Sequence, residues 1–188
     1  TAPFVQAQPM LSNGQSMRGA VVGAILPEEE EKVADLARHM RAGSLGALRA
    51  GEFGVVLGAD LARTLGVLRG DKIALIAPQG IVTPAGVVPR LKQFTVVGSF
   101  DVGFNEADSG LALVHLADAQ KLYQLGESVS GVRLKLEDLF EARTVGRELM
   151  AQLPEMFAWD WSRSNPNLFR AVQIEKRMMF IILTLIIA

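Results

Sequence analysis

The sequence predicts an α+β fold, in which a mixed α/β part built from both ends of the chain encloses a β-rich insertion. Two observations favour this class. A strand–helix–strand pattern occurs near the start of the 188-residue chain and again near its end, whereas short strands dominate the part between them. Apolar residues make up 49% of the sequence, so the chain has enough of them to bury a genuine core.

The charge balance and the absence of cysteine exclude several kinds of function. Nineteen Lys and Arg are matched by 20 Asp and Glu, a net charge of −1, so the chain lacks the broad basic surface that binding to a phosphate backbone normally needs. We therefore expect no nucleic-acid partner. With no Cys, disulfides, thiolate metal sites and a cysteine nucleophile are excluded, although this composition is compatible with any compartment.

The first 48 residues are predicted to contain two antiparallel strands followed by a helix. An Asn-Gly pair at 13–14, a strong hairpin signal, separates strand-like stretches at 3–8 and 16–25. Pro27 and the four Glu after it begin a helix whose apolar face extends to Met40, and the helix dipole favours acidic side chains at that end. We interpret the acidic run as a solvated helix start and not as a metal site.

Residues 49–116 form the β-rich insertion in this prediction. The expected elements are strand-like stretches at 54–58 and 66–76, a helix at 59–65, and a second pair of strands at 90–98 and 111–115. Gly70 and Asp71 are typical of a tight turn that leads into a strand. The glycines of this part lack the Lys of a P-loop and the spacing of a dinucleotide fingerprint, so no phosphate-binding loop is predicted.

The last third of the chain repeats the strand–helix pattern of the first. The expected elements are a helix at 116–125 ending at Gly126, a strand at 132–136, a helix at 138–153 and a strand at 157–161. From Asn165 and Pro166 another helix is predicted to run to Ala188, because these residue types are favoured at the first positions of a helix. Both chain ends thus contribute to one subdomain.

The end of this last helix is strongly apolar. The eleven residues from Met178 to Ala188 carry no charge and present no polar face, whereas a membrane-spanning helix needs roughly 20 residues. Two interpretations are open: a short buried core helix, or the beginning of a transmembrane helix that the sequence does not complete. We favour the second, and we expect both chain ends to be edges of a segment of a longer protein.

The sequence offers few candidates for catalysis. His39 and His115 share no local motif with a nucleophile, and Tyr123 stands apart from scattered carboxylates, so we interpret both His as structural. Glu106 and Asp108 lack the residue order of a Ca²⁺ loop and are interpreted as a solvated turn. We expect no catalysis, no cofactor and no metal. One alternative is an enzyme with a dispersed site, which would require a deep pocket gathering His115, Glu106 and Asp108.

One segment, residues 78–90, has no simple structural explanation. It lies between two good strand candidates, yet it contains three prolines, which exclude central-strand pairing, and four β-branched apolar residues. Exposing so apolar a loop is costly. Two interpretations are open: a long hairpin folded onto its own sheet, or a proline-stiffened arm whose apolar side chains enter a partner's hydrophobic cavity.

Several stretches resemble a known family. The run 167–188, the Trp-Asp-Trp at 159–161 and the motif at 83–89 resemble the lipoprotein-releasing ABC transporter permeases of the LolC/LolE family, and the resemblance covers essentially the whole chain. It implies a MacB-like, type VII permease of the Gram-negative inner membrane. The chain would then correspond to the periplasmic domain between the first two transmembrane helices.

The family's periplasmic domain has a mixed α/β Porter part and an inserted β-rich Sabre part, in agreement with the insertion inferred above. The implied boundaries are a Porter-like subdomain at 1–48 and 117–164, a Sabre-like subdomain at 49–116, and a connecting helix with a truncated transmembrane segment at 165–188. The segment 78–90 belongs to the Sabre-like part in this division.

In this family, LolC-type subunits carry a hairpin called the Hook, which recruits the periplasmic chaperone LolA, whereas LolE-type subunits lack it. Residues 78–90 resemble the Hook, which places the chain with LolC or with the related LolF. Pro84 matches the proline at the Hook tip, Pro89 matches its second proline, and Gly86 permits the bend between them. The implied chaperone-binding residues are Ile81, Val82, Thr83, Pro84, Gly86, Val87, Val88 and Pro89.

Next to the Hook, LolC-type subunits have a basic patch called the Pad. Lys92 matches its basic residue on the return strand, whereas Leu91 and Ala74 stand where the family has a polar residue and an Arg. Arg90 is a candidate for the missing charge. The predicted Pad-like residues are therefore Arg90 and Lys92.

The resemblance also implies the partners. They are LolA, a LolE-type permease subunit, the LolD ATPase, lipoprotein cargo, and the membrane through flanking transmembrane helices. The domain itself is expected to be non-catalytic, because ATP hydrolysis takes place on LolD. The alternative is a MacB-like efflux or mechanotransmission permease whose domain binds an adaptor protein, but those relatives have no proline-rich hairpin at this position.

Overall fold

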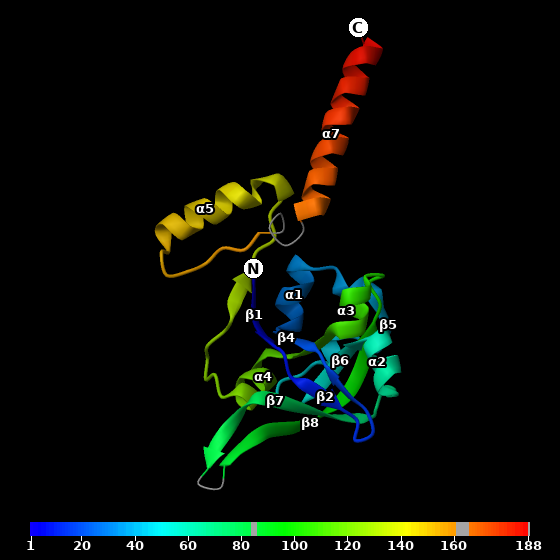
Figure 1. The fold of residues 1–188 in the computed structure, drawn as a ribbon, viewed down its shortest axis with the longest axis vertical. Coiled ribbons are helices and arrows are strands. Elements are labelled where there is room, and N and C mark those ends of the chain that lie inside the picture. Colours follow the sequence, from blue (N-terminus) through cyan, green and yellow to red (C-terminus); the bar gives the residue numbers. More distant parts are fainter. Residues whose placement is uncertain (84–85, 161–165, 188) are drawn as a thin grey trace. The chain divides into compact units, whose positions relative to one another are not determined.

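A computed structural model describes residues 1–83, 86–160 and 166–187. The chain forms two compact units, Thr1–Lys135 and Leu136–Ala188. The α+β class predicted from the sequence is confirmed, since the first unit combines a large mixed sheet with helices packed against it (Figure 1).

The first unit is built around a ten-stranded sheet. Its strands are β1 (Ala2–Ala7), β2 (Met10–Ser12), β3 (Met17–Gly19), β4 (Val21–Ile25), β5 (Met40–Ala42), β6 (Gly54–Gly58), β7 (Lys72–Thr83), β8 (Gly86–Phe100), β9 (Leu111–His115) and β10 (Gly131–Arg133). The order across the sheet is β10-β1-β4-β9-β6-β8-β7-β2-β3, and β5 pairs with β8. β4 pairs with β9 and β6 with β8 in parallel, and the other pairs are antiparallel. Strands from the ends and from the middle of the chain thus share one sheet.

Short helices connect these strands. The first unit contains α1 (Pro27–Val33), α2 (Ala59–Leu65), α3 (Asn105–Gly110), α4 (Leu116–Tyr123) and 3-10 turns at Leu36–His39 and Leu45–Ala47. The second unit contains a 3-10 turn at Leu139–Glu141, α5 (Ala142–Gln152) and α7 (Pro166–Ile187). α7 begins at the proline of the predicted Asn-Pro start. Among the described residues, no helix has both the length and the apolar character needed to cross a membrane.

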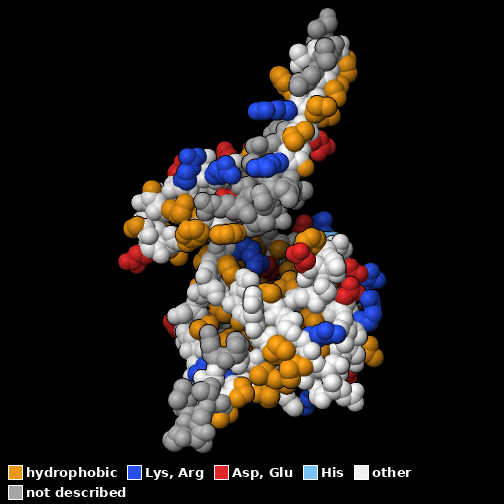
Figure 2. All heavy atoms as spheres, viewed as in Figure 1, with side chains coloured by type: hydrophobic (Ala, Val, Ile, Leu, Met, Phe, Trp, Pro, Cys, Tyr) orange, Lys and Arg blue, Asp and Glu red, His pale blue; other side chains and the backbone are white. Residues whose placement is uncertain are grey.

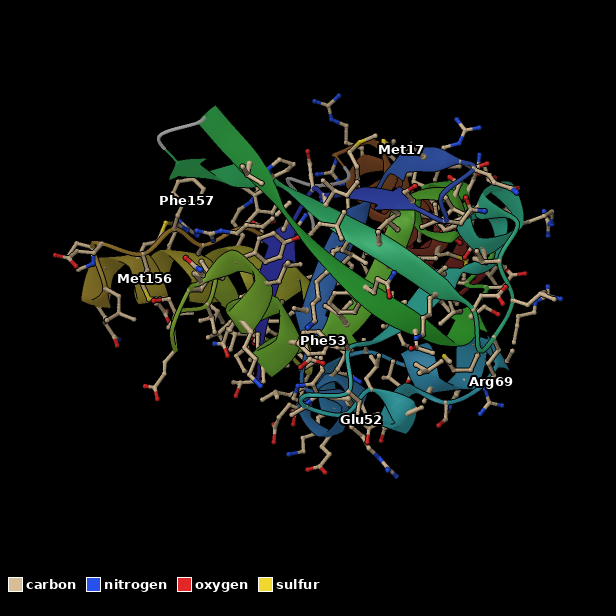
Figure 3. The ribbon with its side chains drawn as sticks, turned by 90° about the horizontal axis from the view of Figure 1, so that it is seen from below. Met17, Glu52, Phe53, Arg69, Met156 and Phe157 are labelled. Atoms are coloured by element: carbon tan, nitrogen blue, oxygen red, sulfur yellow. The ribbon has the colours of Figure 1, made fainter. Side chains whose placement is uncertain are left out.

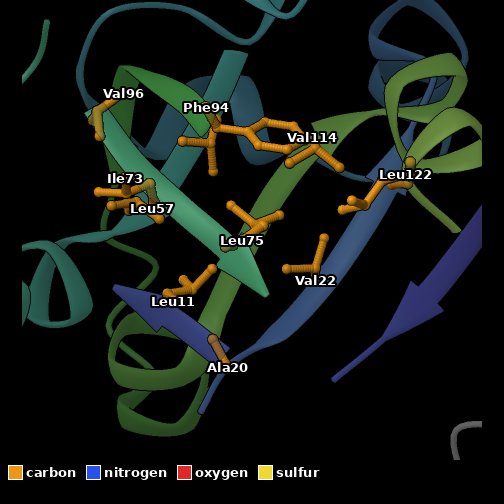
Figure 4. Packing of buried hydrophobic residues seen from close by; sticks show 14 of the residues in the cluster. Leu11, Ala20, Val22, Leu57, Ile73, Leu75, Phe94, Val96, Val114 and Leu122 are labelled. Carbon is orange, nitrogen blue, oxygen red and sulfur yellow. The ribbon is translucent and has the colours of Figure 1, made fainter. Parts of the chain in front are cut away.

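The sheet is buried on both faces at its centre. β6 contributes Val55 and Leu57 to the larger hydrophobic cluster and Val56 to a smaller one, because successive side chains of a strand point to opposite faces. This double burial explains why residues 54–58 lack any polar alternation. Figure 4 shows the larger cluster, to which β7 contributes Leu75 and β8 contributes Phe94. The β7–β8 pair is therefore anchored in the core.

Two predicted turns are confirmed. β2 and β3 form a hairpin across Asn13 and Gly14. In its turn the Asn13 Oδ1 accepts hydrogen bonds from the Gln15 N–H at 2.8 Å and the Ser16 N–H at 2.6 Å. At the second turn Gly70 has a φ of +101°, a conformation that favours glycine, and Asp71 Oδ2 accepts a hydrogen bond from the Leu68 N–H at 2.8 Å.

Two predicted helices end elsewhere. The helix that begins at Pro27 stops at Val33, and a 3-10 turn then leads into β5. α4 ends before Gly126, because Gln124 takes the left-handed position after its last residue, with a φ of +55°. Glycine is the usual residue there, but the Gln124 Oε1 accepts a hydrogen bond from Arg90 Nη2 at 2.7 Å, and this contact helps to hold the conformation.

The strand predicted at 157–161 is not found. Residues 157–160 have no regular secondary structure, and Trp161 lies outside the described residues. A strand needs neighbouring backbone groups to pair with. The strand predicted at 132–136 is observed only as the three residues of β10, and in the described part of the sheet β10 pairs with β1 alone.

The sequence predicts that the acidic run at 28–31 is solvated. This prediction is wrong for Glu30, which is fully buried. Its carboxylate forms an ion pair with Arg133 of β10. The Arg133 guanidinium also lies 5.0 Å from the centre of the Phe4 ring on β1. The pair therefore fastens α1 to the edge of the sheet.

Replacing Arg133 with Met should destabilise the domain, because Glu30 would keep a buried charge without its partner. We expect the free energy of unfolding, measured by chemical denaturation, to fall by at least about 2 kcal/mol. The double variant Glu30→Gln/Arg133→Met should recover most of that loss. A single variant as stable as the unchanged domain would contradict the role given to this ion pair.

Burial also affects Tyr123, the single tyrosine of the sequence. It lies in the core at the end of α4, and its hydroxyl has no hydrogen-bond partner within the described residues. Loss of solvation disfavours the charged phenolate, which raises the pKa of Tyr123 to about 12.

Alkaline titration tests the burial of Tyr123. An unfolded chain ionises its tyrosine near pH 10, so above that pH the unfolded state releases a proton that the folded state keeps until its pKa of about 12. The free energy of unfolding should therefore fall between about pH 10 and 12, by up to about 3 kcal/mol. Near-ultraviolet absorbance follows the ionisation directly, and a midpoint near 10 in the folded domain would contradict the assignment.

Candidate functional site

The described residues of the segment 78–90, which are 78–83 and 86–90, belong to the β7–β8 hairpin. The two strands pair antiparallel as far as Thr83 opposite Gly86, with one register shift after Ala77. In Figures 1 and 3 this hairpin extends beyond the rest of the first unit. The described backbone is thus that of an arm and not of a loop folded onto its own sheet.

Neighbouring strands hold only the inner part of the hairpin. β2 pairs with β7 at residues 74–76, and β6 pairs with β8 at residues 95–100. Farther out, residues 80–83 and 86–89 pair with each other and, in the described part of the chain, with no other strand. The ladder therefore begins in the core and ends as a two-stranded arm with free edges.

Free edges explain how prolines fit into these strands. Pro78 lies in the register shift between Ala77 and Gly80, and Pro89 lies opposite Gly80. Proline has no N–H to donate, so it is tolerated at bulges and on edges but not in a central strand. Pro84, the predicted tip proline, lies outside the described residues.

The hairpin brings the other predicted Hook residues together in pairs. The pairs are Ile81 with Val88, Val82 with Val87, and Thr83 with Gly86. Val88 is 53% exposed and Pro89 is exposed as well, whereas for residues 81–83, 86 and 87 the structure describes the backbone alone.

The base of the hairpin has two different faces. Since side chains alternate along a strand, Arg90, Lys92 and Phe94 share one face of β8 and Leu91 lies on the other. Phe94 belongs to the core, whereas Leu91 is 56% exposed. The two predicted Pad-like residues thus lie on the core-facing side, where α4 and the loop before β6 can reach them.

The opposite face carries an apolar row. Leu91 lies opposite Ile76, which in turn lies opposite Met10 of β2, so the three form a row across three strands. Ala74 is on the same face, two residues before Ile76. Figure 2 shows hydrophobic side chains gathered over these strands. Of the two departures from the Pad, Leu91 therefore belongs to this apolar row, and Ala74 lies beside the row between Ser12 of β2 and Gln93 of β8.

Arg90 ties the hairpin to α4. Its Nη1 donates a hydrogen bond to the Tyr123 carbonyl at 3.0 Å, and its Nη2 donates to Gln124 Oε1 at 2.7 Å. Cations are favoured at the carboxyl end of a helix, where carbonyl groups lack helical partners. The guanidinium is thus engaged within the domain, at the point where the arm leaves the sheet.

Lys92 lies against an aromatic ring. Its Nζ is 4.2 Å from the centre of the Phe53 ring, and that ring meets Phe94 edge to face at 5.4 Å between centres. The Lys92 side chain remains exposed. Sequence reasoning missed Phe53, Tyr123 and Gln124 as neighbours of the site, because they are far from β8 in the sequence and match no motif.

Two of the candidates for catalysis, His115 and Asp108, form local hydrogen bonds. His115 Nδ1 accepts a hydrogen bond from the Ala117 N–H at 3.2 Å and caps α4, and Asp108 Oδ1 accepts one from the Val102 N–H at 2.9 Å. Among the described residues, no group of three or more His, Cys, Asp or Glu could hold a metal. A hollow of about 270 Å³ beside β1, lined partly by Tyr123, is lined by neither His115 nor Asp108.

Curated proteins match the whole chain, although no family model matches it. The lipoprotein-releasing system transmembrane protein LolC of Neisseria meningitidis is 49% identical, over 100% of this chain and 46% of that protein. The LolC of Xylella fastidiosa is 42% identical, over 100% of this chain and 45% of that protein. The LolE of Haemophilus influenzae is 27% identical, over 99% and 45%.

A solved structure shares the fold. It is the extracellular domain of the noncanonic ABC-type transporter YknZ from Gram-positive bacteria, with a TM-score of 0.52, 12% identity, and coverage of 85% of this chain and 78% of that one. This likeness concerns the fold alone. The chain spans a little under half the length of the curated relatives. Over its whole length, the chain is therefore a homologue of one segment of the LolC proteins of lipoprotein-releasing systems.

Proposed function

We propose that this chain is the periplasmic domain of a LolC-type permease in the Gram-negative inner membrane, and that its β7–β8 hairpin docks the chaperone LolA. One observation carries the docking proposal: residues 80–83 and 86–89 pair with each other beyond the strands that flank the base. Such an arm offers both of its edges and both of its faces to a partner. Homology to LolC supports the same assignment.

In this proposal the domain does no chemistry. A LolD ATPase would hydrolyse ATP, a LolE-type subunit would complete the permease, and a lipoprotein released from the membrane would pass to LolA held at the hairpin. The domain's contribution is to keep the chaperone next to the cargo, which raises the probability of transfer before the lipoprotein returns to the membrane.

The hairpin suits this task because its base is already ordered. The core, β2 and β6 fix the inner strands, and Arg90 fastens β8 to α4 at the point where the arm leaves the sheet. A partner that binds a preformed arm orders fewer groups than one that must fold a loop, so less conformational entropy opposes binding. The apolar side chains at 81–88 would then enter a hydrophobic cavity, with a gain of roughly 25 cal/mol per Å² buried.

Charge would guide the encounter. Lys92 is exposed at the base of the arm, where its ammonium can attract acidic groups on the rim of the partner. Charges at the rim of an interface change mainly the association rate, whereas buried anchors change mainly the dissociation rate. Arg90 would contribute to the same field, although its guanidinium is hydrogen-bonded to α4.

The subdomain division is part of the proposal. Residues 1–48 and 117–164 would form the Porter-like part, residues 49–116 the Sabre-like part, and residues 165–188 would lead toward the membrane. The relatives' printed name, transmembrane protein, supports a membrane connection for the longer protein.

Shortening the hairpin tests the docking proposal. Ala77 lies opposite Arg90, so Asn-Gly in place of residues 78–89 would close the two strands with a two-residue turn and leave the base intact. We expect affinity for LolA, measured by titration calorimetry, to fall at least about tenfold. Met17→Ser, an exposed change on the β2–β3 hairpin, is the control and should bind normally. Full LolA binding by the shortened domain would overturn the proposal.

Reversing the charge of Lys92 tests the steering role. Lys92→Glu should slow association with LolA by roughly tenfold at low salt, with a much smaller change in the dissociation rate, as stopped-flow mixing can show. Lys72→Glu makes the same change at the far end of the same strand pair and should have little effect. Equal association rates for the two variants would contradict the placing of Lys92 on the docking surface.

A further inference from the structure

A buried carboxylate fixes the loop that precedes β6. Asp118, in the first turn of α4, is fully buried. Its Oδ1 accepts a hydrogen bond from the Gly51 N–H at 2.6 Å, and its Oδ2 accepts one from the Phe53 N–H at 2.9 Å. The Phe53 carbonyl in turn accepts a hydrogen bond from the Thr95 N–H of β8 at 2.9 Å. A helix and a strand therefore hold the Phe53 backbone from both sides.

This backbone is held in an unfavourable conformation. Phe53 has a φ of +51°, in the left-handed region that a bulky side chain rarely occupies. Such conformations persist where the surrounding structure enforces them, and they occur often at functional sites. The enforced backbone directs the Phe53 ring to the base of the hairpin, where it contacts both Phe94 and Lys92.

We propose that Phe53 is a positioning residue for Lys92, which it holds ready for an acidic group of the docked partner. The inference rests on the proposed function, in which Lys92 faces that partner. The Lys92 Nζ lies 4.2 Å from the ring centre, so the face of the ring attracts the ammonium and restricts its long side chain. Lys92 stays exposed, so its ammonium can still meet a carboxylate. Fewer rotamers are then lost on binding.

The chain of contacts gives α4 a part in docking through the base of the arm. Asp118 fixes Phe53, Phe53 restrains Lys92, and each step is a direct contact. An aliphatic side chain in place of Phe53 would not restrain Lys92 in the same way, because it lacks the aromatic face that attracts the ammonium. A second pair of the same kind, Arg133 over the Phe4 ring at 5.0 Å, lies on β10 and β1 and provides a matched control.

The first test measures the position of Lys92 without any partner. In proton and carbon NMR, the Lys92 side-chain resonances should be shifted by the ring current of Phe53, and Phe53→Leu should return them to ordinary lysine values. Phe53→Tyr keeps an aromatic face and should retain the shift. Unshifted Lys92 resonances in the unchanged domain would overturn the inference, whether or not LolA binds.

The second test measures association with LolA at low salt. Phe53→Leu should slow association about threefold, Phe53→Tyr should bind at nearly the normal rate, and Phe4→Leu should have no effect. The decisive comparison is in a Lys92→Met background, where Phe53→Leu should cause no further loss. A purely structural role for Phe53 would slow binding equally with and without Lys92, and that result would overturn the proposal.

The two tests separate this inference from the proposed function. If LolA fails to bind the unchanged domain, the proposed function falls, and the docking role of Lys92 falls with it. If LolA binds and the ring shift is present, but Phe53→Leu associates as fast as the unchanged domain, the proposed function stands and the positioning role is wrong.

Discussion

The antiparallel pairing of β7 with β8 is the constraint on which the rest of the structure depends. Near the core this ladder is held between β2 and β6, and Leu75 and Phe94 bury its inner face in the larger hydrophobic cluster. Beyond Ala77 and Arg90 the same ladder continues without flanking strands. One continuous element therefore joins the hydrophobic core to an arm without flanking strands, so the direction of the arm is set by the core. A loop of similar composition attached to the surface would have no such direction.

α4 contributes to the hairpin base from both of its ends. At its first turn Asp118 fixes the loop that carries Phe53, and after its last turn the Tyr123 carbonyl and Gln124 accept hydrogen bonds from Arg90. The two basic residues of β8 are thus restrained in different ways, Arg90 as an anchor and Lys92 against a ring. A helix of eight residues links features that are distant in sequence and prepares the surface that the proposed function requires.

Local chemistry decided which features could be predicted from the sequence. The hairpin at 13–14, the turn at Gly70 and the start of α7 depend on residues that are adjacent in the chain, and they were predictable from turn and capping preferences. The unusual composition of 78–90 also marked the arm. Partners far apart in sequence could not be predicted: Glu30 is buried because of a residue 103 positions away, and Phe53 is fixed by an aspartate 65 positions away. The predicted strand at 157–161 failed for a related reason, since pairing depends on a neighbour that a single segment does not specify.

Amide hydrogen exchange along β7 and β8, measured with and without LolA, tests the central claim most directly. We expect slow exchange at residues 72–77 and 91–100 in the free domain, where core and flanking strands protect the ladder, and faster exchange at 80–83 and 86–88. Addition of LolA should slow exchange in this outer part and leave the rest of the sheet unchanged. Protection that appears elsewhere in the domain, with the arm unaffected, would contradict the claim that the hairpin is the docking element.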